Sequence, residues 1–286
     1  MEYISQNNSV LLKGINDFNC THTFDCGQCF RWEKQDDGSY TGVAFGKVVN
    51  VSDTGNGIVI KNTTVEDVEN IWVDYLDLKR DYNSIKNLYI NDKNLKPAMD
   101  FGFGIKILKQ EIFECLLSFI ISTQNGIPRI KKIVSKLSSM YGDKIEFEGK
   151  EYYCFPTPEQ LKGITEKDLE PLKAGYRAAY IVDCVNKVVS GETDLEKISL
   201  MDTDDARKEL LKIKGVGPKV ADCVMLFSMG KYESFPIDVW VKRTMSTLYL
   251  DENASNNEIQ KYAKENFGKY AGMAQQYLFY YARENW

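Results

Sequence analysis

The stretch Leu211–Gly230 reads LKIKGVGPKVADCVMLFSMG and decides the fold prediction. A helix is expected from Thr203 to Lys212, and the glycines of the turn that follows permit positive φ and close approach of another molecule. Pro218 suits the first residue of a second helix, because the N–H that proline lacks has no intrahelical partner there. The free N–H groups at that helix start favour an anion such as a phosphate. The pattern predicts a helix-hairpin-helix at about 203–229, a motif that holds a DNA backbone without reading sequence.

Two residues beside this hairpin add chemistry to it. Lys219 lies next to an otherwise apolar helix face, and partial desolvation favours the neutral, nucleophilic form of a lysine amine. Asp238 follows Pro236-Ile237 and precedes the helical pattern VWVKRTMSTLY, which is an N-cap position. A carboxylate that caps a helix and also faces the lysine could stabilise an oxocarbenium-like sugar cation and handle protons. A glycine turn alone is equally typical of two packed helices, and capping alone explains many aspartates.

The hairpin, Lys219 and the Pro-x-Asp segment together resemble the helix-hairpin-helix DNA glycosylase superfamily, and its bifunctional branch in particular. Three further segments are similar to the 8-oxoguanine DNA glycosylase family and follow its order along the chain. They are TFDCGQCFRW (Thr23–Trp32), GIKILKQEIFECLLSFIISTQNGIPRI (Gly104–Ile130) and YAGMAQQYLFYYA (Tyr270–Ala282). The resemblance implies a divergent bacterial 8-oxoguanine DNA glycosylase with AP lyase activity, acting on double-stranded DNA in base excision repair.

The resemblance also implies a role for each matching position. Lys219 would attack the sugar C1′, expel the base and leave an imine that eliminates the 3′ phosphate, with Asp238 as its partner. Gly27 would accept the N7–H of 8-oxoguanine through its carbonyl oxygen. The flipped base would be held by Cys223, Gln275 and Phe279, although core packing is the alternative for Cys223 and Phe279.

Two more groups of residues are assigned to the DNA. The hairpin backbone at Gly215, Gly217 and Val220 is expected to bind phosphate. The opposite-base and gap-filling positions are Gln124, Asn125, Arg129, Tyr176 and Arg177. Four positions depart from the family pattern, namely Gln124 for an asparagine, Lys214 for a proline, Phe227 for a methionine and Trp240 for a histidine. None of these departures affects Lys219 or Asp238.

The rest of the chain predicts an α+β fold with two parts. Residues 1–102 are expected to form a small antiparallel β domain with a helix, and residues 103–286 a mostly helical body that contains the hairpin. Within the first part, the alternating run Ser39–Val51, a turn at Gly55–Gly57 and a second strand predict a β-hairpin, and Thr63 or Thr64 opens a helix. Helices are further expected at about 111–124, 128–140, 158–171, 175–190, 203–212, 218–229, 239–249 and 257–283, the last one broken.

Composition limits the function classes further. The net charge of −5 comes from residues 1–100, whereas residues 101–286 hold 26 basic and 26 acidic side chains, so a basic face is compatible with the charge balance. A single histidine, His22, argues against His-based triads and multi-His metal sites. Seven cysteines without a secretory signal favour reduced thiols, and we expect a soluble, cytoplasmic, monomeric protein associated with DNA and not with a membrane.

No cofactor is expected to be required. The Cys26–Cys29 pair lacks the second pair or the histidine that a zinc site needs, and the last cysteine, Cys223, leaves no C-terminal iron–sulfur cluster. A structural cation held by backbone carbonyls at about Lys212–Gly217 is a property of the resembled family. Two alternatives stay open at this point: an alkylated-base glycosylase, which would lack Lys219, and a non-catalytic DNA-binding module, which would leave Lys219, Asp238 and Gly27 unexplained.

Overall fold

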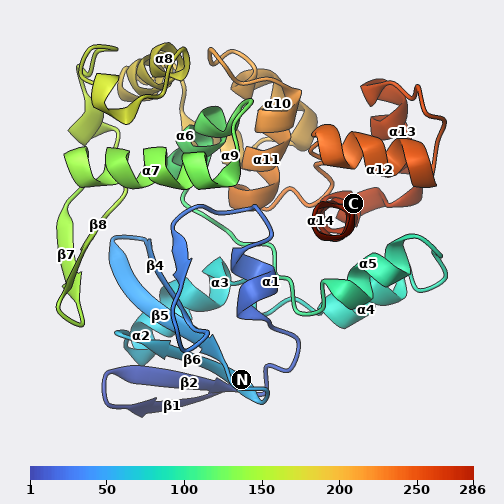
Figure 1. Ribbon diagram of the computed structural model, residues 1–286, viewed down its shortest axis with the longest axis horizontal. Helices are drawn as coiled ribbons and strands as arrows, with labels where there is room; N and C mark the ends of the chain where they lie inside the picture. The colour runs from blue at the N-terminus through green and yellow to red at the C-terminus, as the bar shows by residue number, and fades with distance from the viewer.

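The computed structural model describes residues 1–286 and confirms the α+β architecture, with an antiparallel sheet packed on a mostly helical body (Figure 1). Six strands form the sheet in the order β1-β2-β6-β5-β4-β3, and every neighbouring pair is antiparallel. Their bounds are β1 Glu2–Gln6, β2 Ser9–Lys13, β3 Trp32–Lys34, β4 Tyr40–Ala44, β5 Lys47–Asp53 and β6 Gly57–Lys61.

The run Ser39–Val51 forms two strands, not the single strand that its alternation predicted. β4 ends at Ala44 and β5 begins at Lys47, and the two residues between them, Phe45 and Gly46, have φ of +50° and +69°. Two-residue turns with positive φ match the right-handed twist of the strands that they join. The alternating pattern continues on both sides of this turn, so the turn is hidden in the sequence. The expected second hairpin, β5–β6, is confirmed.

The helix expected after the sheet begins where its cap predicts. The Thr64 side chain accepts a hydrogen bond from the backbone N–H of Asp67 at 3.1 Å. The helix is composite, with α2 at Val65–Asp67, a π-helical turn at Val68–Trp72 and α3 at Val73–Tyr75. Its buried face includes Trp72, whose indole N–H donates to the Thr63 hydroxyl. This face covers the small core beneath the sheet.

Most of the remaining helices match their predicted ranges. The body contains α6 Ile112–Ser122, α7 Ile127–Tyr141, α8 Arg177–Val189, α10 Thr203–Leu210, α11 Pro218–Ser228, α12 Val239–Leu248, α13 Asn256–Asn266 and α14 Ala271–Asn285. A 3₁₀ turn at Gly268–Tyr270 makes the expected break between α13 and α14. The sequence did not predict the short elements α1 Cys20–Phe24, α4 Tyr82–Asn87, α5 Leu95–Phe101, α9 Leu195–Leu200 and the hairpin β7 Lys144–Phe147 with β8 Lys150–Tyr153.

The helix predicted at 158–171 is wrong. The segment contains only two 3₁₀ turns, at Glu159–Leu161 and Glu170–Leu172. Gly163 between them has φ +77°, which ends any helix, and Pro171 has no N–H to continue one. Its apolar residues are nevertheless buried, because single turns place Leu161 and Leu172 against the body. The apolar periodicity of this segment therefore predicted correctly which side chains are buried, but it predicted the wrong secondary structure.

Two hydrophobic cores lie in the molecule. The smaller one joins the sheet to α1 and α3, and the larger one lies within the helical body. Side chains of α4 and α5, including Tyr82, Leu95 and Met99, belong to the larger core, and α5 packs on α14. The helical core therefore extends back to about Tyr82, into the part of the chain assigned to the β domain, and the boundary after residue 102 stays a prediction.

The elements that carry the predicted site converge where the two parts meet. Figure 1 shows α1 between the sheet and α14, with α11 and α12 nearby in the helical body. Helix α11 packs on α6, and α12 packs on α14. The turn after α1 thus faces α14, although the two segments are about 250 residues apart in the sequence.

Candidate active site

The hairpin between α10 and α11 requires glycine at its centre. Gly215 has φ +86°, and a Cβ added there would lie 2.3 Å from Cδ2 of Tyr180, so no other residue fits without displacing that ring. Gly217 is the N-cap of α11 and has φ −96°, with no neighbouring atom within 4 Å of an added Cβ. One glycine therefore serves the packing of the protein, whereas the other leaves the outer side of the turn open.

The backbone donors that were assigned to phosphate are unpaired. The N–H groups of Gly215, Gly217 and Val220 donate to no acceptor in the chain, while Ala221 N–H makes the first bond of α11, to the carbonyl oxygen of Gly217. Unpaired donors at a helix start, together with the helix dipole, favour a bound anion. Helix α8 fixes this turn by two hydrogen bonds. Asp183 accepts from Lys214 N–H at 2.8 Å, and Lys187 Nζ donates to the Lys212 carbonyl oxygen at 2.6 Å.

Lys219 lies in the first turn of α11 with its side chain partly buried. Its Nζ is 4.8 Å from the centroid of the Phe119 ring on α6, and no carboxylate lies within 4.0 Å of it. Phe119 in turn stacks on Phe227, with ring centroids 5.6 Å apart. The amine thus lies at the end of an apolar wall, as the sequence predicted for a lysine beside an apolar face, and it forms no ion pair.

Asp238 caps α12, as its position in the sequence predicts. One carboxylate oxygen, Oδ1, accepts a hydrogen bond from Val241 N–H at 2.8 Å. Burial raises the pKa of Asp238 above its ordinary value, and the Val241 N–H and the charge of Lys219 oppose this shift. The backbone N–H of Trp240 also opposes the shift, so the start of α12 holds the carboxylate while it lines the pocket.

Six predicted site residues line a single pocket. They are Gly27, Lys219, Cys223, Asp238, Gln275 and Phe279. Four further residues line it to which the sequence analysis gave no role in the site, namely Phe119, Phe227, Pro236 and Gln276. The pocket encloses about 30 Å³, which suffices for water and not for a purine base. A base can therefore enter only if side chains of the wall move.

Gly27 lies in a turn that has a specific conformation. Gly27 lies between α1, which ends at Phe24, and the strand β3, which starts at Trp32. Gly27 has φ +84°, and a Cβ added there would lie 3.1 Å from Cε1 of Phe279. Its carbonyl oxygen accepts no hydrogen bond in the chain. A free backbone acceptor is therefore placed at the rim of the pocket.

Two side chains in and beside the pocket support a recognition role. Gln275 is buried, and its Oε1 has no hydrogen-bond partner. An unsatisfied buried polar atom costs about 1–3 kcal/mol, so this amide is better explained by a partner that binds there than by packing. Burial raises the pKa of Cys223 to about 11, so its thiol stays neutral and presents an apolar surface to the pocket.

The positions assigned to the opposite base form a second group, between α6, α7 and α8. Gln124 has φ +49°, and its side-chain Oε1 lies 3.3 Å from the hydroxyl of Tyr176, which is 49% exposed. Asn125 donates to the Ile121 carbonyl, and Arg129, an exposed residue, donates to the Lys173 carbonyl. The exposed side chains of this group, Gln124, Arg129 and Tyr176, lie on the surface around the loop that follows α6.

Arg177 holds the loop that carries Gln124. It is only 4% exposed, and its guanidinium donates to the carbonyl oxygens of Thr123, Gln124 and Ala174. These hydrogen bonds fix the backbone of that loop in this structure. The direct contact of Arg177 with the opposite base stays a prediction.

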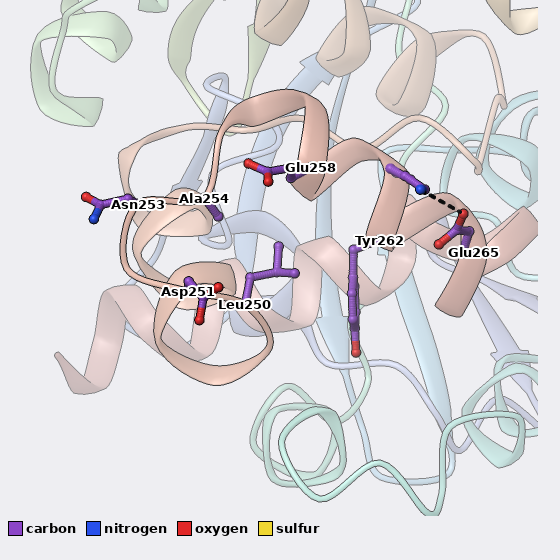
Figure 2. A pocket seen from close by; sticks show the side chains of 8 residues that line it. Leu250, Asp251, Asn253, Ala254, Glu258, Tyr262 and Glu265 are labelled. Atoms are coloured by element: carbon purple, nitrogen blue, oxygen red, sulfur yellow. Dashed lines mark ion pairs between the residues drawn. The ribbon is translucent and has the colours of Figure 1, made fainter.

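The remaining features carry no part of the site. Figure 2 shows a pocket at the turn between α12 and α13, where Leu250 and Tyr262 lie among carboxylates and a Lys261–Glu265 ion pair; no predicted site residue lines it. Cys26 and Cys29 are buried free thiols, and His22 lies on α1 with its ring Nδ1 2.7 Å from the Phe103 carbonyl oxygen. The chain contains no cluster of three or more His, Cys, Asp or Glu side chains arranged for a metal ion. None of its helices combines the length and apolar character that a bilayer crossing needs.

Comparison with known proteins agrees with this site. Residues 10–116 match the model of the 8-oxoguanine DNA glycosylase N-terminal domain, and residues 117–269 match that of the HhH-GPD superfamily of base excision DNA repair proteins. A protein of Methanothermobacter thermautotrophicus named probable N-glycosylase/DNA lyase is 33% identical over 247 residues, which cover 79% of this chain and 77% of the relative. An N-glycosylase/DNA lyase of Arabidopsis thaliana is 29% identical over 279 residues, which cover 90% and 75%.

A solved structure is similar over the whole chain. The crystal structure of Clostridium acetobutylicum 8-oxoguanine glycosylase/lyase, in complex with double-stranded DNA containing cytosine opposite 8-oxoguanine, is 48% identical in sequence. It superposes with a TM-score of 0.98 and covers 100% of this chain and 98% of that one. The chain therefore belongs to the HhH-GPD superfamily of base excision DNA repair proteins and, within it, to the 8-oxoguanine DNA glycosylase family.

Proposed function

We propose that this protein is a bifunctional DNA glycosylase and AP lyase that removes 8-oxoguanine from double-stranded DNA in base excision repair. The observation that carries the proposal is one pocket that contains Lys219, Asp238, a free Gly27 carbonyl and the unpaired amide of Gln275. A nucleophile, a carboxylate and base-recognition groups thus lie within reach of one nucleotide. The similarity to the Clostridium acetobutylicum 8-oxoguanine glycosylase/lyase supports the substrate.

The reaction follows from the two catalytic residues. The Lys219 amine attacks C1′ of the flipped nucleotide and gives up a proton, the C1′–N9 bond breaks, and the base leaves with its electron pair and takes up a proton. Negative charge on Asp238 stabilises the oxocarbenium-like sugar as the bond breaks. The C1′–Nζ adduct opens to an imine, which acidifies the C2′ protons. Removal of one of these protons expels the 3′ phosphate and cleaves the strand.

Recognition of the base rests on the opposite wall of the pocket. 8-Oxoguanine carries an N7–H that can donate to the free Gly27 carbonyl, whereas N7 of guanine would place two acceptors against each other. Phe279 and Cys223 would hold the base from its two faces, and Gln275 would pair with its Watson–Crick edge. Taking the base out of the duplex fits a pocket in which aromatic rings lie beside polar groups that can read the base.

The remaining DNA contacts hold the duplex around the flipped nucleotide. Unpaired N–H groups of Gly215, Gly217 and Val220 would bind a phosphate, and Tyr176, Gln124, Asn125 and Arg129 would fill the gap and contact the opposite base. The proposed chemistry needs no cofactor, because the amine and carboxylate supply every step. A structural cation at Lys212–Gly217 remains a proposal, and one carbonyl there, that of Lys212, already accepts from the Lys187 ammonium.

We further propose that the protein acts as a monomer on DNA in the cytoplasm, where its seven free thiols would stay reduced. Each residue placed in the site comes from this single chain, so the proposed reaction requires no second copy. Size-exclusion chromatography of the protein, alone and bound to a lesion-containing duplex, would test the monomeric state.

Borohydride trapping tests the catalytic proposal. An end-labelled duplex with one 8-oxoguanine opposite cytosine is incubated with protein and borohydride, beside an undamaged duplex and the Lys219→Gln variant. A covalent adduct that forms only on the damaged duplex and only with Lys219 present supports the proposal. Release of free base without an adduct would indicate a monofunctional glycosylase, and binding without either product a non-catalytic module.

A further inference from the structure

Two side chains of α14 hold the turn that carries Gly27. Gln276 Nε2 donates to the Cys26 carbonyl at 2.7 Å, and Arg283 Nη2 donates to the Asp25 carbonyl at 2.6 Å. Gln276 is 2% exposed, so its bond is shielded from water. One helix therefore fixes the two carbonyl groups directly before Gly27. These two bonds are the only hydrogen bonds between α14 and this turn.

Fixing these carbonyls also restricts the carbonyl of Gly27. Peptide groups are planar, so the direction of a carbonyl is set by the few dihedral angles that join it to its neighbours. At Gly27 those angles are the least restricted, because glycine has no Cβ and here adopts φ +84°. Anchors on the preceding peptides, together with Gln28, whose carbonyl oxygen accepts from Gln110 Nε2 at 2.7 Å, limit the directions that the Gly27 carbonyl can take.

Arg283 also contacts the aromatic residue of the pocket. Its guanidinium carbon lies 5.5 Å from the centroid of the Phe279 ring, within the range of a cation–π interaction. A Cβ added to Gly27 would lie 3.2 Å from Arg283 Nη1 and 3.1 Å from Phe279 Cε1, so the three groups pack against one another. Arg283 itself does not line the pocket. It lies behind the two groups that would contact the base.

One donor of Arg283 is left over. Nη1 is buried and has no hydrogen-bond partner, whereas Nε and Nη2 bind Glu284 and the Asp25 carbonyl. A buried donor without a partner costs stability. The arginine is thus poorly explained as a packing residue, because a shorter or apolar side chain would avoid that cost.

We propose that Arg283 and Gln276 are positioning residues for lesion recognition, which aim the Gly27 carbonyl and the Phe279 ring at the flipped base. This inference rests on the proposed function. It separates the recognition of the base from the chemistry at the sugar. Lys219 on α11 and Asp238 at the start of α12 take no part in the hydrogen bonds that Gln276 and Arg283 make to the Gly27 turn. Loss of the anchors should therefore impair base excision and spare the lyase step.

Two reactions of the full-length protein test this separation. Single-turnover excision of 8-oxoguanine opposite cytosine requires base recognition, whereas cleavage at a preformed abasic site has no base to recognise. For Arg283→Gln we expect excision to fall by about 10- to 100-fold, the effect of displacing a recognition group by about 1 Å, with abasic-site cleavage unchanged. Arg283→Lys, which can still donate to Asp25, should recover part of the loss.

Gln276→Met and Glu284→Gln provide a second variant and a matched control. Gln276→Met keeps the size of the side chain and removes the bond to Cys26, so it should show the same selective loss. Glu284→Gln removes the carboxylate that pairs with Arg283 and leaves the carbonyl contacts, so both reactions should stay at wild-type rates. Equal losses in both reactions, or excision at the wild-type rate in both anchor variants, would overturn the inference. Failure of the unsubstituted protein in both reactions would instead overturn the proposed function.

Discussion

Lys219 Nζ lies 4.8 Å from the centroid of the Phe119 ring, although the two residues are 100 positions apart in the sequence. The contact exists because α11 packs on α6, and it holds the amine against an apolar wall at the mouth of the pocket. The lysine is therefore ordered by packing and by a π face, and no carboxylate competes with the substrate for its nitrogen.

Lys219→Gln should abolish strand cleavage and borohydride trapping while leaving duplex affinity within about threefold, because the unpaired hairpin N–H groups belong to the backbone. Adduct formation on a gel and duplex binding by fluorescence anisotropy measure the two effects. Lys214→Gln, at an exposed position of the same hairpin, is the control and should still form the adduct. An adduct formed by Lys219→Gln would assign the nucleophile to another amine.

Asp238→Asn should reduce excision by at least about 100-fold with little loss of stability. Asparagine can still accept from Val241 N–H and cap α12, so only the charge is removed. Asp238→Ala removes the cap as well and should cost about 1 kcal/mol of unfolding free energy in addition. Single-turnover excision and urea unfolding separate the two losses. Excision by Asp238→Asn at the wild-type rate would remove this carboxylate from the mechanism.

The pH dependence of excision should reflect the buried carboxylate. Burial raises the pKa of Asp238, so at mildly acid pH a larger fraction of it is protonated than of an exposed aspartate. As the pH is lowered, excision should therefore begin to fall at a higher pH than it would with an aspartate of ordinary pKa. For stability the sign is opposite. The folded state binds this proton more tightly than the unfolded state, so the ionised group destabilises the fold at neutral pH, and this cost disappears as the pH falls through the raised pKa.

This linkage is testable by melting temperature. Asp238→Asn should melt at or above the wild-type temperature at neutral pH, and the difference should shrink as the pH is lowered. A difference that grows toward acid pH would contradict the raised pKa.

Gly27→Ala should lower stability and selectively impair excision. The φ of +84° alone costs an alanine about 1–2 kcal/mol, and its Cβ would press on Phe279 and Arg283. Gly163→Ala is the matched control, because Gly163 has φ +77° and no atom within 4 Å of an added Cβ. Both variants should lose stability in urea unfolding, Gly27→Ala the more because its Cβ meets Phe279 and Arg283, but only Gly27→Ala should lose excision. Equal activity in the two variants would mean that the Gly27 turn takes no part in recognition.

The two hairpin glycines should respond differently to alanine. Gly215→Ala would place Cβ 2.3 Å from the Tyr180 ring at φ +86° and should destabilise the fold by about 2 kcal/mol or more. Gly217→Ala meets no atom and should stay within about 1 kcal/mol of wild type. Its methyl group would stand beside the unpaired N–H groups, so affinity for damaged and undamaged duplexes should fall by the same factor. A fall confined to the damaged duplex would contradict phosphate binding at this turn.

Local signals in the sequence were sufficient for much of this molecule. Pro218 after a glycine turn marks the start of α11, and Asp238 before an apolar helix marks the start of α12, because caps and helix starts depend on a few adjacent residues. The resemblance of four segments supplied the pocket residues, and the pocket does contain Gly27, Cys223, Gln275 and Phe279. It could not supply the hydrogen-bond partners and the burial of each side chain.

Tertiary structure decided the features that depend on distant partners. Residues 158–171 have helical periodicity, yet Gly163 and Pro171 divide them into separate turns that still bury the same side chains. The resemblance predicts that Arg177 contacts the opposite base, and only the fold shows that its donors bind carbonyl oxygens of the loop after α6. Gly163 and Pro171 explain the break locally, but the burial of the two turns and the acceptors of Arg177 depend on which surface each segment meets in the folded chain.

The sequence by itself determined the helix-hairpin-helix, the lysine and the aspartate, since the signals for them lie within about thirty consecutive residues. Only the tertiary structure showed that Gln276 and Arg283 hold the backbone of Cys26 and Asp25, about 250 residues away. A backbone carbonyl carries no side-chain signature, so nothing in the sequence marks it as an acceptor. Its partner becomes identifiable only when packing brings α14 against the turn after α1.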